Sequence, residues 1–307
     1  MTGGSGGEAV TYSIVARDDL TGELGVAVQT CMFAVGSLVP WARPGVGVVV
    51  SQAISGPAYG PRCLDALAAG RSAVDALGAA QAADPVAALR QVGVVAADGT
   101  VAVATGALCI DHAGHVMGDG FAVQANMMSS PDVWPAMASA FESSAGPLAR
   151  RLLAALVAGE GAGGDARGRM SAALLVVEGR PQEQAGVGTV VDLRVDRSDD
   201  PLSELARLLD AAEAFAGYNL AVEQLFGGDP SAALGTIDRA LHDLPGEDNL
   251  RFVRAGALLA SGATDAAVTE LRSLIAGRPS WEVVVRSFAT KGLIALPEGL
   301  SVDAVLR

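Results

Sequence analysis

TYSIVARDDLTGELGVAVQT, residues 11–30, is the stretch that decides the fold. Residues 11–16 and 25–30 are rich in the β-branched and apolar side chains that are typical of strands. Between them lie Asp18, Asp19, Thr21 and Gly22, which are residue types that favour turns. The stretch therefore predicts a β-hairpin.

Further strands are predicted on the C-terminal side of this hairpin. Residues 45–53 contain four valines in a short, nearly continuous apolar run, as expected for a buried strand. Residues 92–96 and 101–105 flank Asp98-Gly99, a pair that strongly favours a hairpin turn. Three more strands are predicted at residues 121–127, 172–177 and 190–195.

Two helical segments separate these strands. In residues 61–83, apolar side chains recur at helical spacing up to Asp84-Pro85, which predicts one or two helices. Residues 132–157 have the same pattern, and residues 159–168 are predicted to form a glycine-rich loop. Hairpins and helices in this order favour stacked antiparallel sheets covered by helices. A doubly wound nucleotide-binding fold fits less well.

From residue 201 the pattern is helical only, and it repeats every 34 residues. Seven positions match at this offset: Tyr218 with Phe252, Leu225 with Leu259, Gly228 with Gly262, Ala232 with Ala266, Ala233 with Ala267, Ile237 with Leu271, and Pro245 with Pro279. This is the period of tetratricopeptide repeats. Two repeats are fewer than the three normally needed, so we expect them to dock on the first domain or to pair with another copy in a homo-oligomer.

The predicted organisation is a leader at residues 1–10, a domain at residues 11–200 and the helical module at residues 201–307. Four glycines and one serine make the leader flexible in this prediction. The chain has 34 acidic and 21 basic residues, and its net charge of −13 repels nucleic acid and anionic lipids. It lacks a long apolar run and a signal peptide, so we expect a cytoplasmic protein that binds neither nucleic acid nor membrane, with reduced cysteines.

Eight strings along residues 11–196 resemble one bacterial family. They are TYSIVARD (11–18), TGELGVAV (21–28), PWARPGVG (40–47), PAYGPR (57–62), RQVGVV (90–95), AVQANM (122–127), RGRMSAALLVV (167–177) and DLRVD (192–196). The chain is similar, over its first two thirds, to a bacterial family of unknown function that is grouped with the N-terminal-nucleophile (Ntn) hydrolases.

This resemblance implies an α+β fold, in which a four-layer αββα Ntn-hydrolase-like sandwich is followed by the small all-α helical-repeat module. In the sandwich, two antiparallel sheets lie face to face with helices outside. Some relatives carry a C-terminal segment described as peptidoglycan-binding. Residues 279–307 look similar to it, with Trp281, Val284, Val285 and Phe288.

The resemblance also implies a nucleophile at Thr11. In an Ntn hydrolase, the first residue of a strand attacks through its hydroxyl or thiol, and its own α-amine is the base. An α-amine has a pKa of about 8, closer to operating pH than the value of about 10.4 for lysine. Most relatives begin Met-Thr-Phe/Tyr-Ser, but here residues 1–10 precede Thr11 and acylate its nitrogen. Either the leader is removed, or Thr11 is a strand-opening threonine without a catalytic role.

Other residues are candidates for the same site. Ser13 lies on the same strand face and is a candidate second hydroxyl or substitute nucleophile. Asn126 ends an apolar strand and is a candidate oxyanion donor, or else it bonds a neighbouring turn. Arg43 is a candidate for lowering the pKa of the amine or binding a substrate carboxylate, the alternative being a solvated surface arginine. The candidate substrate-binding residues are Gln52, Tyr59 and Arg62.

No metal or cofactor is expected. Cys109, Asp111, His112 and His115 lie within seven positions, but they lack the paired spacing of zinc motifs and predict a loop with structural histidines. The glycine-rich segments have no P-loop lysine, which argues against phosphate binding.

Two functions remain open. The first is an Ntn-type amidohydrolase that acts on a small amide, ureide or peptide-like C–N bond after the leader is removed, and the resemblance favours it. The second is a noncatalytic binding or scaffold protein, whose sandwich and helical repeats hold a peptide, a cell-wall fragment or a partner subunit. The blocked Thr11 amine and the short repeat array motivate this alternative.

Overall fold

A computed structural model describes residues 8–9, 11–182, 184, 186–294, 296 and 301–306. The chain divides into two compact units, Met1–Arg207 and Leu208–Arg307. Of the predicted leader, residues 1–7 and 10 lie outside the described residues, whereas Glu8–Ala9 form the short strand β1. A strand this short was not indicated by the glycine-rich composition of the leader.

One sheet, here called sheet 2, contains the predicted hairpin. β2 (Thr11–Arg17) and β3 (Leu24–Thr30) pair antiparallel, with Thr11 opposite Thr30. Both strands are central, because the order of the sheet is β11-β10-β3-β2-β9-β8. The remaining strands also pair antiparallel: β8 (Gly114–Gly118), β9 (Phe121–Asn126), β10 (Ser171–Val177) and β11 (Thr189–Val195).

The other sheet, sheet 1, is built around β5 (Gly47–Ile54) and β6 (Arg90–Ala96). β7 (Val101–Thr105) pairs with β6 across the predicted Asp98-Gly99 turn. β4 (Pro40–Arg43) and β1 both pair with β5, along the edge that β6 does not occupy. Sequence analysis did not predict β4 or β8, because neither has the run of β-branched residues that is typical of a strand.

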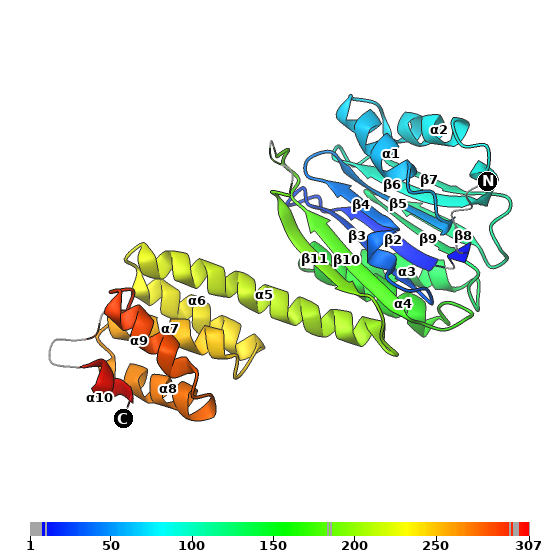
Figure 1. Cartoon of the computed structure of the whole chain (residues 1–307). Coiled ribbons are helices and arrows are strands. Elements are labelled where there is room, and N and C mark those ends of the chain that lie inside the picture. Colours follow the sequence, from blue (N-terminus) through cyan, green and yellow to red (C-terminus); the bar gives the residue numbers. More distant parts are fainter. Residues whose placement is uncertain are drawn as a thin grey trace, which may run out of the picture. The chain divides into compact units, whose positions relative to one another are not determined.

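Helices cover the outer faces of both sheets (Figure 1). α1 (Tyr59–Ala68) and α2 (Ala73–Ala82) pack on sheet 1, and α3 (Val133–Ser143) and α4 (Leu148–Gly161) pack on sheet 2. The predicted α+β class, two antiparallel sheets with helices, is confirmed. The helical pattern at residues 132–157 is two helices because Gly146, with a φ of +97°, and Pro147 interrupt it.

The inner faces of the two sheets pack against each other and differ along their length. Toward one end, both sheets contribute buried valines, which are Val15, Val26, Val28, Val48, Val50 and Val95. Toward the other end, the same strand faces carry buried polar side chains, which are Thr11, Ser13, Gln52, Gln91, Gln124 and Asn126. The sequence alternation of each strand separates this inner face from the helix-covered face, because residues two apart share a face.

The second unit is built from helices, as its sequence pattern predicts. α5 (Pro201–Phe226) crosses the division between the units and is followed by α6 (Pro230–Asp243), α7 (Asp248–Ala260), α8 (Thr264–Gly277), α9 (Trp281–Thr290) and α10 (Val302–Leu306). The fully buried residues Ala233 in α6 and Ala267 in α8 occupy equivalent positions of the repeat. Within the described residues, no helix has both the length and the apolar character that crossing a membrane requires.

Asp18 fixes the turn between β2 and β3. One carboxylate oxygen accepts hydrogen bonds from the amides of Leu20 and Thr21, at 3.0 and 2.8 Å. The other oxygen lies 3.1 Å from the Arg151 guanidinium of α4. Burial alone would raise the pKa of Asp18, but the Thr21 and Leu20 hydrogen bonds and the Arg151 charge together lower it.

We expect Asp18→Asn to lower the free energy of unfolding at pH 7 by about 1–3 kcal/mol, because the variant loses charge-assisted hydrogen bonds. A lowered pKa means that this stabilisation is present above the pKa of the unfolded state and is lost as pH falls through the folded-state pKa. The two proteins should therefore converge in acid. Urea unfolding at several pH values measures the difference, with Asp19→Asn as the control, because Asp19 is 71% exposed. Equal losses in the two variants at pH 7 would contradict the expectation.

Candidate functional site

Thr11 lies at the polar end of the interface between the sheets. It faces Thr30 of β3 on one side and Asn126 of β9 on the other. Its side chain is fully buried, and its Oγ1 lies 3.4 Å from the Oγ1 of Thr30. Two residues before it, Ala9 pairs with β5 in the opposite sheet. Ala9 thus belongs to sheet 1, whereas Thr11 belongs to sheet 2.

Two amide side chains hold the main-chain carbonyl of Thr11. Gln52 Nε2, from β5, donates a hydrogen bond to this oxygen at 3.0 Å, and Asn126 Nδ2, from β9, donates another at 3.2 Å. A carbonyl oxygen has two lone pairs, so these bonds fill its capacity as an acceptor. Thr11 is therefore held in place from both sheets at once.

Gln91 of β6 links these two amides. Its Oε1 accepts from Gln52 Nε2 at 2.8 Å and from Asn126 Nδ2 at 3.0 Å. Its own Nε2 donates to the Ala125 carbonyl and the Thr105 hydroxyl, both at 2.9 Å. Both hydrogens of the Asn126 amide are thus directed at protein acceptors. In this arrangement Asn126 positions Thr11. It would donate a hydrogen bond to an oxyanion only if it gave up one of these two bonds.

Ser13 lies deeper between the sheets and has no exposed surface. Its Oγ donates to Gln52 Oε1 at 2.5 Å and accepts from Gln124 Nε2 at 2.7 Å. Gln124 fits there because Gly93 of β6 has no side chain, and a Cβ at that position would lie 2.4 Å from Gln124 Oε1. The Ser13 hydroxyl hydrogen is already used within what we call the amide cluster, which consists of Gln52, Gln91, Gln124 and Asn126.

An ion pair lies beside the Thr30 end of β3. The carboxylate of Asp165, from the loop after α4, is fully buried and accepts a hydrogen bond from the Cys31 amide at 2.9 Å. It also accepts from the Arg167 amide at 2.9 Å, and the Arg167 guanidinium lies 3.4 Å away. Because Cys31 directly follows Thr30, this ion pair lies beside the end of β3 that carries Thr30.

The other predicted site residues lie elsewhere. Arg43 is paired with Gly47, at the opposite end of β5 from Gln52, and its guanidinium bonds Asp65 of α1 at 2.7 Å. Tyr59 is buried at the start of α1, where burial and the nearby Asp84 raise its pKa to about 12. Arg62 is exposed on the same helix. The structure therefore brings together Thr11, Ser13, Gln52 and Asn126, but not Arg43, Tyr59 and Arg62.

The predicted histidine loop is partly a strand. His115 lies in β8 and its Nδ1 is 2.9 Å from the Thr105 hydroxyl, while burial lowers its pKa. His112 Nδ1 lies 2.9 Å from the Met128 carbonyl. Burial raises the pKa of the Cys109 thiol. Among the residues that the structure describes, no group of three or more His, Cys, Asp or Glu side chains is arranged to hold a metal ion.

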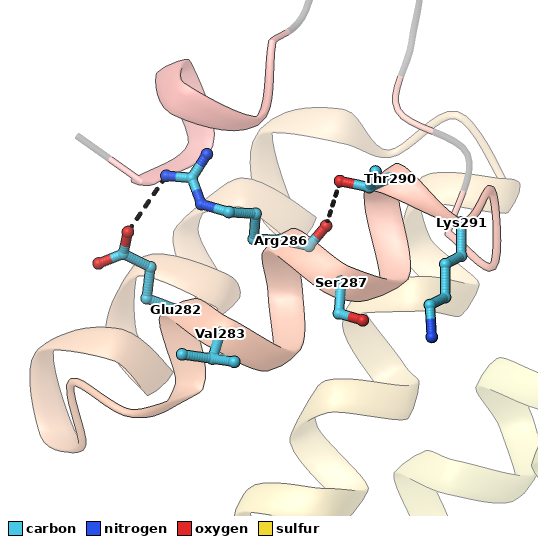
Figure 2. Close-up of a pocket in the computed structure, with 6 residues that line it drawn as sticks. All are labelled: Glu282, Val283, Arg286, Ser287, Thr290 and Lys291. Atoms are coloured by element: carbon cyan, nitrogen blue, oxygen red, sulfur yellow. Dashed lines mark hydrogen bonds and ion pairs between the residues drawn. The ribbon is translucent and has the colours of Figure 1, made fainter.

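Described residues of the second unit line two pockets considered below. One, of about 430 Å³, is lined by α5, α7 and α9, with the aromatic rings of Tyr218, Phe252, Trp281 and Phe288. The other, of about 350 Å³, follows the exposed face of α9 (Figure 2), where Arg286 bonds Glu282 at 3.1 Å. Its lining comes from α9 and the residue after it, whereas three helices surround the first, as is usual for a ligand pocket.

Four residues near the site were not predicted from the sequence: Gln91, Gln124, Thr30 and Asp165. A usable signal existed for the glutamines, because each interrupts an apolar strand at an inward-facing position, as Gln52 also does. The sequence contains no comparable signal for Thr30 and Asp165, because a strand-ending threonine and a loop aspartate are common in any domain. The place of Thr30 beside Thr11 depends on strand register, and the place of Asp165 beside Cys31 depends on the path of its loop.

We expect Gln52→Ala to lower the free energy of unfolding by about 3 kcal/mol or more, because it removes one hydrogen-bond partner from each of three buried groups, the Thr11 carbonyl, the Ser13 hydroxyl and Gln91 Oε1. Gln182→Ala is the matched control, since Gln182 is exposed and bonds Glu178 at the surface. Chemical denaturation of both variants measures the difference. If Gln52→Ala were as stable as the control, the amide cluster would not hold the sheets together.

Comparison with known proteins identifies relatives of the first unit. The crystal structure of protein SPO2555 from Silicibacter pomeroyi, described as a DUF1028 protein, matches with 34% sequence identity and a TM-score of 0.60. The match covers 66% of this chain and 86% of that one. No curated protein matches. The family of unknown function DUF1028 matches residues 11–205, from the first residue of β2 into α5. The chain therefore belongs to DUF1028, as its resemblance to a family of unknown function predicted.

Proposed function

We propose that the first unit is an Ntn-hydrolase-like sandwich, and that Thr11 is its nucleophile in a latent form. The reaction would be hydrolysis of a small amide, ureide or peptide-like C–N bond. The observation that carries the proposal is the position of Thr11. It opens a central strand, and amides from both sheets hold its carbonyl at 3.0 and 3.2 Å.

These two hydrogen bonds lie on the carbonyl side of Thr11, away from the peptide bond that precedes it. Cutting that peptide bond would therefore free an α-amine without removing the bonds that hold the residue. Pairing with β3 and β9 would also persist. The new amine would have a pKa of about 8 and would lie within reach of the hydroxyl of the same residue.

The proposed reaction has two steps. Thr11 Oγ1 attacks the substrate carbonyl carbon while the amine takes the hydroxyl proton and passes it to the leaving nitrogen, which departs as an amine. Water then attacks the resulting ester, giving a carboxylic acid and restoring the threonine. Thr30, whose Oγ1 lies 3.4 Å from that of Thr11, would orient the hydroxyl, and Asn126 would keep the residue in position.

We expect hydrolysis only from protein that begins at Thr11. A ubiquitin fusion, cut directly before Thr11 after folding, supplies this form, and intact mass confirms its first residue. Against a panel of amides, ureides and short peptides, its kcat/KM should exceed that of the uncut chain by at least about 100-fold, because an acylated nitrogen is not a base.

Two variants control this experiment. Thr11→Ala in the processed form should reduce hydrolysis to background, and Thr11→Ser should retain part of it because a hydroxyl remains. Equal activity of the uncut chain, together with an unimpaired alanine variant, would rule out Thr11 as the nucleophile.

A second candidate function, a binding role, has support from the pocket in the second unit. We propose that this unit is a tetratricopeptide-like pair of repeats, and that its aromatic pocket holds an apolar segment of a peptide or partner. The volume of about 430 Å³ and the apolar lining fall within the range of ligand pockets. The start of α8 at Thr264, 34 residues after that of α6 at Pro230, supports the repeat assignment.

Phe226→Ala tests this binding role, because Phe226 lines the pocket and is 61% exposed. We expect it to weaken binding of an apolar fluorescent probe, such as anilinonaphthalene sulfonate, by about 10-fold. Val283→Ala is the control, since Val283 is 71% exposed and lies outside this pocket. Titrations that gave the same affinity for both variants would place the probe elsewhere.

A further inference from the structure

The edge of β5 that faces away from β6 is shared between two short strands. β4 occupies its first half, where Pro40–Arg43 pair with residues 47–50. β1 occupies its far end, where Glu8 pairs with Ile54 and Ala9 pairs with Ala53. Within the described residues, the leader is the strand that fills this far end. Its removal would expose the main-chain groups of Ala53 and Ile54.

This edge adjoins the residue that holds Thr11. Gln52, which donates to the Thr11 carbonyl at 3.0 Å, directly precedes Ala53 in β5. Ala9 is separated from the peptide bond that acylates Thr11 by one residue, and Glu8 is separated from it by two. A chain paired with Ala53 and Ile54 in the same way would have its next residue at Thr11. The carbonyl group of that residue would then face the Thr11 nucleophile.

We propose that this end of β5, residues 53–54, is a strand-docking subsite, and that the substrate of Thr11 is an extended peptide or peptide-like chain. The two residues before its acyl residue would pair with Ala53 and Ile54 as Ala9 and Glu8 do. The proposal rests on the proposed hydrolase function and adds the substrate class to it. The leader is the occupant that the structure shows in this place.

Strand pairing suits the chemistry of the site. An added strand is held by main-chain hydrogen bonds, so it is recognised through its extended backbone more than through particular side chains. After docking, Thr11 Oγ1 attacks the carbonyl of the third residue and the amine on its far side leaves with a proton. Water then releases that residue as a carboxylic acid, still attached to the docked pair. The leader mimics the acyl half of such a substrate.

Processed protein, spanning residues 11–307, tests this subsite with peptides derived from the leader. The probe is acetyl-Gly-Gly-Glu-Ala-Val joined to a fluorogenic coumarin amine. A second peptide carries N-methyl groups on both Glu and Ala, because only alternate residues of a strand donate to a given neighbour. A third carries its N-methyl group on the first glycine and is the matched control. Acetyl-Val-coumarin amide lacks the docking residues.

We expect kcat/KM for the unmodified and control peptides to exceed that of the doubly methylated peptide and of the short amide by about 10-fold or more. A separate readout does not need catalysis. In processed Thr11→Ala protein, the product acetyl-Gly-Gly-Glu-Ala-Val should shift the NMR signals of the Ala53 and Ile54 amides. The amides of Val48 and Val49, in the half of the edge that β4 covers, should not shift.

The outcomes separate the two proposals. Hydrolysis of short amides with no advantage for the longer peptide, or equal cleavage of the doubly methylated peptide, would overturn the docking subsite while the hydrolase stands. Shifts at Ala53 and Ile54 without hydrolysis of any probe would support the subsite as a strand-binding site and overturn the catalytic role. The absence of both shifts and hydrolysis would overturn both.

Discussion

Burying a polar side chain between two sheets is tolerated only when its hydrogen-bonding groups find partners. In the first unit the amide cluster supplies many of these partners, because its members come from β5, β6 and β9 and bond one another as well as the backbone, although Gln124 Oε1 has no partner. Since the partners belong to both sheets, the cluster sets how the sheets lie against each other at this end. The position of Thr11 follows from that constraint, because its carbonyl is one of the acceptors the cluster needs.

The sequence predicted most of the regular elements, and the reasons are local. The β2–β3 and β6–β7 hairpins carry turn residues between apolar strands, and both form as expected. β4 and β8 were not predicted because their own residues have little strand propensity. They form strands through pairing with a neighbouring strand, which cannot be recognised from a short segment alone. The strand at Glu8–Ala9 likewise depends on the exposed edge of β5. The break at Gly146-Pro147 was readable from the sequence, but the helical pattern around it is continuous.

The candidate site was predicted in part. Thr11 was named from a resemblance, and Ser13 and Asn126 were named from their positions on strands; the structure brings the three together with Gln52. Arg43 was named for its charge and its place before a buried strand, yet the antiparallel pairing of β4 directs it to the other end of β5. Which end of β5 lies beside Arg43 cannot be derived from the composition of the segment. Gln91 and Gln124 show the converse, since their inward position was visible in the strand pattern but their mutual bonding depends on how the sheets stack.

The chemical type of the amide cluster has a consequence for its behaviour in solution. Glutamine and asparagine side chains, like the hydroxyls of Thr11 and Ser13, do not gain or lose protons between about pH 3 and pH 10. Asp165 and Arg167 form an ion pair beside Cys31, the residue after Thr30. The hydrogen bonds of the amide cluster therefore do not depend on a protonation state in mildly acidic or mildly alkaline surroundings. Any pH dependence of chemistry at Thr11 would then originate in groups that titrate, and not in the amide cluster that holds this residue.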